Sequence, residues 1–207
     1  MFLVFDGLDG AGKSTQLNLL VDWLTESGHE VVSCKDPGST PLGERLRELL
    51  LNEDGTRISM LAEMMLFTTA RTELVQQVVK PALGSGKVVV LDRYILSTVV
   101  YQGHAGDLDP DDIRKVNHIA TEGLQPDLTF VFDLSVDLAM ERLGDSLDRM
   151  ESRGHEYFGK VRGGFREEAE RFPVGVEIVD ASRDIESIQS EIRTAVSALI
   201  QKSGGTK

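Results

Sequence analysis

Short apolar runs alternate with helical patterns along this chain. Five runs are rich in β-branched residues, have few polar positions and cover residues 2–5, 31–34, 88–91, 128–132 and 176–179. Such runs are typical of strands in a parallel sheet with both faces covered by helices. The pattern therefore predicts five buried parallel strands.

The segments between these runs carry apolar residues at helical spacing. We predict helices over residues 16–24, 59–83, 111–122, 136–143 and 185–200. Asp109-Pro110 is an N-cap and first-turn pair before the third helix, Ser135 caps the fourth, and the Gly-Ser-Gly of residues 84–86 ends the second. This order predicts an α/β fold, a doubly wound parallel five-stranded sheet flanked by helices, with right-handed crossovers.

Length and composition indicate one soluble domain. The chain has 207 residues, 41% of them apolar and 27% charged, and lacks internal repeats or linkers. We assign residues 1–202 to a single domain and residues 203–207 to a flexible tail. The net charge of −12 argues against nucleic acid as a partner. No apolar stretch reaches the ~18 residues of a membrane span, and the start lacks the basic segment of a signal peptide, so we expect no membrane partner and a cytoplasmic location.

The most specific chemical signal is FDGLDGAGKST at residues 5–15. Gly7, Gly12, Lys13 and Ser14 fill the pattern G-x-x-x-x-G-K-[ST] between a predicted strand and a helix. Such a loop points backbone N–H groups at phosphate oxygens, the lysine reaches the β- and γ-phosphates, and the serine hydroxyl can bind Mg²⁺. The alternative is a tight turn with a chance Gly-Lys-Ser. We predict a nucleoside triphosphate site formed by Gly7, Asp9, Gly10, Ala11, Gly12, Lys13, Ser14 and Thr15.

Two further groups of charged residues suit phosphate chemistry. Asp92 and Arg93 follow the strand of residues 88–91, where an aspartate can hold Mg²⁺ and an arginine can grip a second phosphate, unless they form a surface turn. Arginines and glycines are dense between Arg142 and Arg171, which fits a mobile lid over about residues 142–164. A solvated helix with arginine–glutamate pairs is the alternative for the later part of this segment.

A general base is missing from the motifs, because the four histidines are scattered along the chain. A nucleoside monophosphate would not need one, since its second pKa lies near 6 and it is already mostly an anionic nucleophile at neutral pH. The enzyme would then work by positioning and charge neutralisation.

Five segments together resemble the thymidylate (dTMP) kinase family of phosphate-loop (P-loop) nucleoside monophosphate kinases. They are the phosphate loop, residues 36–47 (DPGSTPLGERLR), residues 66–71 (LFTTAR), residues 92–103 with Asp92-Arg93-Tyr94, and Asp148-Arg149. The resemblance implies transfer of the γ-phosphate of ATP to dTMP, giving dTDP and ADP for dTTP biosynthesis, by a homodimer that uses Mg²⁺.

The resemblance also implies residue roles. Phe67 would stack on thymine, Arg71 and Thr98 would bond the base, Tyr101 would exclude a ribose hydroxyl at C2′, and Asp9 would lie near the sugar and phosphate of dTMP. Ser14 and Asp92 would place Mg²⁺. The full set expected around dTMP is Asp9, Pro37, Arg47, Phe67, Arg71, Arg93, Ser97, Thr98, Tyr101 and Gln102.

The chain departs from the family pattern where the transition-state arginine is expected. Position 10 is glycine, which resembles the members that supply this arginine from the lid, but Gly144 replaces the first lid arginine. We rank Arg149 first, then Arg153, then Arg142. The expected catalytic residues are Lys13, Asp9, Arg93, Arg149 and Arg153, and Arg142 joins the residues that bind the triphosphate.

Two other functions remain open from the sequence. The first is a kinase for a different nucleoside monophosphate or a small metabolite; dUMP differs from dTMP by one methyl, worth roughly 1–3 kcal/mol in an apolar pocket. The second is a nucleotide-dependent regulatory switch, which the absence of a guanine-reading Asn-Lys-x-Asp disfavours.

Overall fold

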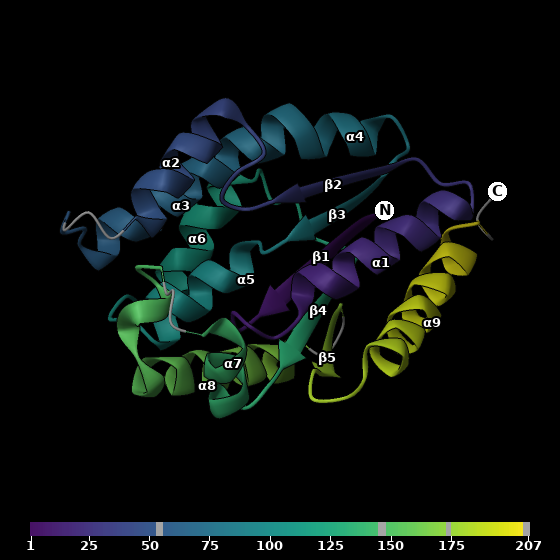
Figure 1. Cartoon of the computed structure of the whole chain (residues 1–207). Coiled ribbons are helices and arrows are strands. Elements are labelled where there is room, and N and C mark those ends of the chain that lie inside the picture. Colours follow the sequence, from purple (N-terminus) through teal and green to yellow (C-terminus); the bar gives the residue numbers. More distant parts are fainter. Residues whose placement is uncertain (53–55, 145–147, 173–174, 205–207) are drawn as a thin grey trace.

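The computed structural model describes residues 1–52, 56–144, 148–172 and 175–204. All five predicted strands form, and they build one parallel sheet in the order β2-β3-β1-β4-β5 (Figure 1). The strands are β1 (Phe2–Gly7), β2 (Val31–Lys35), β3 (Val88–Asp92), β4 (Leu128–Asp133) and β5 (Val176–Asp180). This confirms the predicted doubly wound α/β fold.

The central strand β1 divides the core into two parts. Leu3 and Phe5 belong to a cluster that includes apolar residues of the first and last helices, whereas Phe2 and Val4 belong to a second cluster with Leu74. Side chains alternate across a strand, so one run of consecutive apolar residues fills both faces of the sheet. This burial accounts for the lack of polar positions in the run.

The predicted helices also form, with small changes at their ends. The elements are α1 (Lys13–Glu26), α2 (Pro41–Leu51), α3 (Met60–Leu74), a π-helical segment η1 (Val75–Val79), α4 (Lys80–Gly84), α5 (Ile95–Thr98), a second π-helical segment η2 (Val99–His104), α6 (Pro110–Ala120), α7 (Val136–Leu143), a 3₁₀ turn η3 (Glu151–Arg153), α8 (His155–Arg171) and α9 (Ile185–Gly204). The predicted helix 59–83 is thus the α3–η1–α4 sequence. In the described residues, no helix is long and apolar enough to cross a membrane.

Side chains at the predicted N-caps accept hydrogen bonds from the first turns of their helices. Asp109 accepts from the backbone N–H of Asp111, and Ser135 accepts from that of Leu138. Each bond satisfies an N–H group that has no partner inside the helix. These starts could be predicted because the capping interaction is local in sequence.

Helix α8 covers much of the predicted lid. Its residues Phe158, Val161 and Phe165 are buried in the core, so residues 155–164 belong to a packed helix. At Gly164 an added Cβ would lie 2.7 Å from the Cβ of His104, so this glycine lets α8 approach η2 closely. The rest of the predicted lid includes residues 145–147, which lie outside the described residues, as do residues 205–207 of the predicted tail. The mobility of the lid and of the tail stays a prediction.

Candidate active site

The loop between β1 and α1 is shaped by glycines at positive φ. Gly10 has φ +77°, and a Cβ there would lie 2.5 Å from the backbone oxygen of Ala139 on α7. A side chain at position 10 would therefore be strained and would collide with the backbone. The phosphate loop of this chain cannot supply an arginine from that position.

Lys13, the first residue of α1, is buried beneath the loop. Its Nζ donates to the carbonyl oxygens of Gly7 at 3.2 Å and Leu8 at 2.7 Å, and it lies 3.9 Å from Oδ1 of Asp9. Burial and the nearby charge of Arg93 lower the pKa of Lys13, and the pairing with Asp9 opposes this shift. The lysine is thus held at the loop by three oxygen atoms.

Ser14 and Asp92 meet beside this lysine. The Ser14 hydroxyl donates to Oδ2 of Asp92 at 3.4 Å, while Oδ1 of Asp92 is buried and has no hydrogen-bond partner among the residues that the structure describes. A hydroxyl and a carboxylate are hard oxygen ligands, and Mg²⁺ binds through one or two protein oxygens plus phosphates and water. The residues present therefore fit Mg²⁺.

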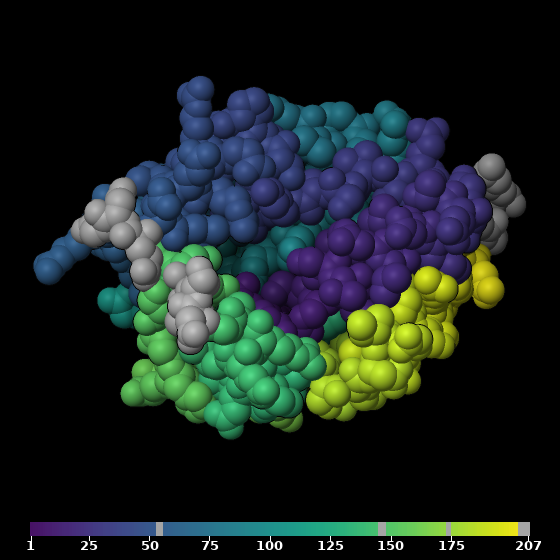
Figure 2. Space-filling model, viewed as in Figure 1, coloured from purple at the N-terminus to yellow at the C-terminus, as the bar shows by residue number. Residues whose placement is uncertain are grey.

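A pocket of about 850 Å³, open solvent at its mouth included, lies over this loop. Figure 2 shows the hollow between the blue α2 region and the green α7 region, with the purple N-terminal segment at its floor. The residues that line it are Asp9, Gly10, Gly12, Lys13, Ser14, Thr15, Lys35, Asp36, Arg47, Asp92, Arg93 and Arg142. We call it the phosphate pocket.

Most residues predicted to bind the triphosphate line the phosphate pocket, and two do not. Ala11 is buried in the core, and Gly7 contributes its carbonyl oxygen to Lys13 and Arg93. Lys35 lines the pocket without having been anticipated. It ends a strand, as Asp92 does, and that position is the signal that could have identified it.

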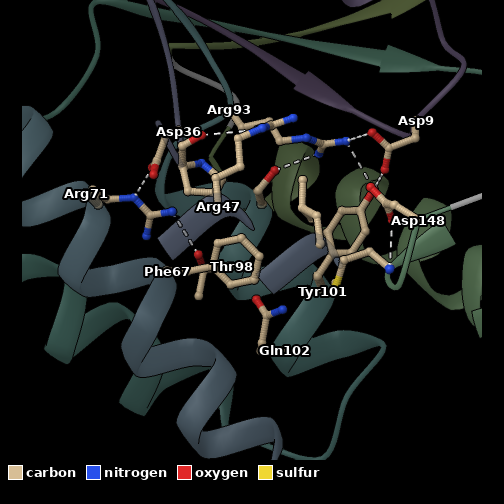
Figure 3. Close-up of a pocket in the computed structure, with 14 residues that line it drawn as sticks. Asp9, Asp36, Arg47, Phe67, Arg71, Arg93, Thr98, Tyr101, Gln102 and Asp148 are labelled. Carbon is tan, nitrogen blue, oxygen red and sulfur yellow. Dashed lines mark hydrogen bonds and ion pairs between the residues drawn. The ribbon is translucent and has the colours of Figure 1, made fainter. Parts of the chain in front are cut away.

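A second pocket of about 520 Å³, again with open solvent included, lies next to the first. All ten residues predicted around the nucleotide line it: Asp9, Pro37, Arg47, Phe67, Arg71, Arg93, Ser97, Thr98, Tyr101 and Gln102. Asp36, Leu51, Asp148 and Met150 complete the wall (Figure 3). We call it the acceptor pocket. It brings together segments from five parts of the chain.

Arg93 lies at the centre of this arrangement. Arg93 is the first residue after β3. Its backbone φ is 67°, an uncommon conformation for a residue with a side chain. Its guanidinium donates to the carbonyl oxygen of Gly7 at 3.0 Å, to Oγ of Ser97 at 2.9 Å and to Oδ1 of Asp9. The acidic neighbours, Asp9 first, raise the pKa of Arg93 against the effect of burial, so it stays charged.

The pKa values of Asp6 and Asp9, the two aspartates nearest the start of the phosphate loop, are shifted in opposite directions. Burial raises the pKa of Asp6 to about 6, although Arg93 and the hydrogen bond from Ser97 oppose this. Burial would raise the pKa of Asp9 too, but the charges of Arg93 and Lys13 outweigh it and lower that pKa to about 2. Asp9 is therefore a carboxylate at neutral pH and a hydrogen-bond acceptor only.

The far end of the acceptor pocket is held by a buried arginine. Arg71 is 1% exposed; its Nε bonds Oδ2 of Asp36 at 2.5 Å, its Nη2 donates to Oγ1 of Thr98 at 2.9 Å, and its Nη1 contacts Oδ1 of Asn117. Burial raises the pKa of Asp36, and pairing with Arg71 counteracts that shift. Asn117 lies on α6 and gave no sequence signal, because only tertiary packing brings it here.

Tyr101 forms the wall between the ends of the acceptor pocket. Its hydroxyl donates to Oδ2 of Asp9 at 3.0 Å, and its ring lies 5.2 Å from the Arg93 guanidinium. Edge contacts with Tyr157 and Phe165 fix the ring. In Figure 3 the ring stands between Asp9 and the Phe67 side of the pocket. A rigid ring in this place can restrict the shape of a ligand.

The structure separates the three candidate lid arginines. Arg142 lines the phosphate pocket, where its Nη1 lies 3.5 Å from the carbonyl oxygen of Gly10 and 3.4 Å from that of Ala181. Arg149 and Arg153 line neither pocket; each donates to Oε2 of the buried Glu63 at 2.5 Å. In this conformation the two arginines that we ranked first are paired to a carboxylate outside the phosphate pocket.

The two pockets share Asp9, Asp36, Arg47 and Arg93. A triphosphate on the loop and a second ligand in the acceptor pocket would meet at these residues, between two arginines and two aspartates. Fold and site together define a phosphate-loop phosphotransferase with separate donor and acceptor pockets.

Comparisons with known proteins agree with this class. The thymidylate kinase family model matches residues 5–192. A thymidylate kinase of Exiguobacterium sp. is 41% identical over 100% of this chain and 99% of its own length, and one of Symbiobacterium thermophilum is 40% identical over 98% and 95%. The crystal structure of thymidylate kinase from Ehrlichia chaffeensis superposes with a TM-score of 0.78 at 30% identity, covering 95% of this chain and 98% of that one. The chain belongs to the thymidylate kinase family, which confirms the resemblance drawn from its motifs.

Proposed function

We propose that this protein transfers the γ-phosphate of ATP to dTMP and releases dTDP and ADP. Family membership supports the reaction, and the observation that carries it is the junction of the two pockets at Asp9, Asp36, Arg47 and Arg93. ATP would bind over the phosphate loop and dTMP in the acceptor pocket. Their reacting phosphates would then be held beside Arg93.

The acceptor pocket has the chemistry for a deoxypyrimidine monophosphate. Phe67 offers a flat apolar face for the base, and Arg71 and Thr98 offer polar groups at its edge. Tyr101 would lie against C2′ of the sugar, held there by its bond to Asp9. Arg47 and Arg93 would bind the phosphate of dTMP, since both line the boundary between the pockets.

On the donor side, Lys13 would bind the β- and γ-phosphates, and Ser14 and Asp92 would hold Mg²⁺. Bound there, Mg²⁺ neutralises negative charge on the phosphates. Lys13 now donates to Gly7 and Leu8 and would transfer those hydrogen bonds to phosphate oxygens. The residues of the loop thus position the γ-phosphate and balance its charge.

Proton abstraction is not required of this site. The dTMP phosphate is already an anionic nucleophile near neutral pH. Asp9 is committed to Arg93 and Tyr101 and has a pKa of about 2, so it would fix these two groups instead of acting as a base. Positioning and positive charge would therefore supply the rate acceleration.

We propose Arg142, ahead of Arg149 and Arg153, as the arginine that stabilises the γ-phosphate during its transfer. The ranking from the sequence had placed Arg142 last. Arg142 lines the phosphate pocket, and among the described residues it bonds only backbone carbonyls, which it can leave without exposing a buried charge. Moving Arg149 or Arg153 would break an ion pair with the buried Glu63.

The reaction is tested by following ADP release from ATP with a panel of nucleoside monophosphates. We expect dTMP to be the best acceptor, dUMP to be weaker by one methyl contact, and dCMP and the purines to be poor. Equal ADP release with and without an acceptor would contradict the proposal and indicate a nucleotide switch.

The remaining expectations concern the assembly and its surroundings. We propose a homodimer, which exposed apolar side chains on α2 and α3 support: Leu42, Leu49, Leu61 and Met65. Sedimentation analysis across a range of concentrations tests it. Need for Mg²⁺ is tested with a chelator. The cytoplasmic location and the lack of nucleic-acid binding stay predictions.

A further inference from the structure

One buried carboxylate behind the acceptor pocket bonds three side chains that belong to different elements. Glu63, on α3, is 0% exposed. Its Oε1 accepts from Nε2 of Gln102 at 2.8 Å, and its Oε2 accepts from Arg149 and Arg153 at 2.5 Å each. Glu63 itself does not line the pocket.

The bond to Gln102 determines which end of its amide faces the ligand. A carboxylate only accepts hydrogen bonds, so the NH₂ group of Gln102 must point to Glu63. The amide oxygen is then the atom directed to the pocket, and Figure 3 shows it on the side of Phe67. The pocket therefore presents a hydrogen-bond acceptor at this point.

The other oxygen of Glu63 fixes the segment that closes the acceptor pocket. Arg149 also donates from Nε to the carbonyl oxygen of Leu50 at 2.6 Å, and Arg153 donates to the hydroxyl of Tyr157 at 2.7 Å. Asp148 and Met150, on either side of Arg149, line the pocket. Glu63 thus anchors Arg149, and the residues on either side of Arg149 line the acceptor pocket.

We propose that Glu63 is a positioning residue of the acceptor pocket: it orients the Gln102 amide so that the pocket accepts bases that carry an N–H at N3, and it anchors the segment of residues 148–153. This rests on the proposed function. Thymine and uracil carry a donor at N3, whereas neutral cytosine carries an acceptor there. An amide oxygen at this place accepts a hydrogen bond from N3 of thymine or uracil and repels the N3 lone pair of cytosine.

The substitution Glu63→Gln separates this proposal from a simple packing role. Glutamine has one acceptor oxygen where glutamate has two. Two guanidinium groups attract that oxygen more strongly than one amide does, so the new NH₂ would face Gln102. Two NH₂ groups would then meet, and Gln102 would turn its own NH₂ toward the ligand.

We therefore expect E63Q to bind dTMP about tenfold more weakly than the wild type. The ratio of its affinities for dTMP and dCMP should also fall about tenfold, which is the scale of one mismatched buried hydrogen bond. The KM for ATP should stay within twofold. E63D, which keeps both oxygens, should keep the preference. The matched control E73Q changes a half-buried glutamate of the same helix that bonds Gln77 at the surface, and it should behave as wild type.

The double variant E63Q/Q102E places a donor at position 63 and an acceptor at position 102, so the two side chains are complementary again with the polarity of the wild-type bond reversed. It should recover most of the preference, which a packing defect would not do. Binding of dTMP and dCMP is measured by calorimetry and turnover by ADP release, with thermal unfolding to confirm folding.

An unchanged dTMP-to-dCMP ratio in E63Q, or no recovery in the double variant, would overturn the role of Glu63. If E63Q does not fold, the double variant and E63D decide the matter in the same way. A wild type that binds dTMP but does not phosphorylate it would contradict the proposed function alone, because the binding ratios still report on Glu63.

Discussion

The phosphate pocket and the acceptor pocket share Arg93 but are built in different ways. The phosphate loop with the start of α1 is one continuous segment, shaped by its glycine positions, and it supplies six of the twelve residues that line the phosphate pocket. The acceptor pocket takes side chains from five distant segments and holds them through buried ion pairs such as Arg71–Asp36. A backbone site depends on local sequence, whereas a side-chain site depends on the positions of whole elements.

This difference makes the two sites respond differently to substitution. Removal of the Lys13 charge should reduce turnover and leave the fold intact, because within the described part of the chain Lys13 bonds only Gly7, Leu8 and Asp9. Changes in the acceptor pocket should alter selectivity or stability as well, because its polar groups also hold elements together.

The largest effect is expected for Lys13→Met. Loss of the charge that stabilises the transferring phosphate should lower kcat by about 10²- to 10³-fold, with unchanged thermal unfolding. Lys87→Met, on an exposed lysine paired with Glu30, is the control. Transfer within tenfold of wild type would show that the loop does not bind the triphosphate as we describe.

The second prediction compares Arg142, which lines the phosphate pocket, with Arg149, which lines neither pocket. Arg142→Ala should lower kcat about 10²-fold with little change in KM for dTMP, since the contact would form mainly in the transition state. This is less than the ~10³-fold of a single arginine finger, because Lys13 and Arg93 remain. Arg149→Ala should act mainly on KM for dTMP. The opposite pattern in steady-state kinetics would restore the order that we derived from the sequence.

The third prediction concerns stability and pH. Burial raises the pKa of Asp6 from 3.8 to about 6, so the folded protein binds this proton more tightly than the unfolded chain. The wild type therefore loses stability as pH rises from about 4 to 6. Asp6→Asn should be about 2 kcal/mol more stable at pH 7.5, after allowance for a weakened bond to Ser97, and the gain should vanish near pH 4.

Urea unfolding at several pH values measures this difference, with the exposed Asp22→Asn as the control. Asp9 should behave in the opposite way, because its lowered pKa stabilises the folded state above pH 4 and that contribution is lost as the pH falls toward 2. A gain for Asp6→Asn that does not depend on pH would contradict the buried-carboxylate explanation.

The smallest effect is expected at the sugar. The wild type should prefer dTMP over its ribose counterpart by roughly tenfold or more in kcat/KM, because the Tyr101 ring occupies the space that a 2′-hydroxyl needs. Tyr101→Phe should keep this preference, and Tyr101→Ala should reduce it to within about threefold. Equal kcat/KM for both substrates in the wild type would show that the ring does not contact C2′.

The sequence alone was sufficient for the fold and for ten of the fourteen residues that line the acceptor pocket. Apolar runs gave the strands, capping residues gave helix starts, and the glycine-lysine pattern gave the phosphate loop, because each signal acts over a few neighbouring residues. Helix α8 was obscured by its glycines and arginines. Gly164 has no side chain, so α8 can contact His104 of η2 at this point. The local sequence does not reveal this contact.

Only the tertiary structure decided how the charged groups are paired. Arg142, Arg149 and Arg153 look alike in the sequence, yet one lines the phosphate pocket and two bond Glu63. Glu63 itself lies on an apolar helix and carried no motif. The physical reason is that a buried charge must find an opposite charge, and the folded arrangement of distant helices determines which partner is within reach.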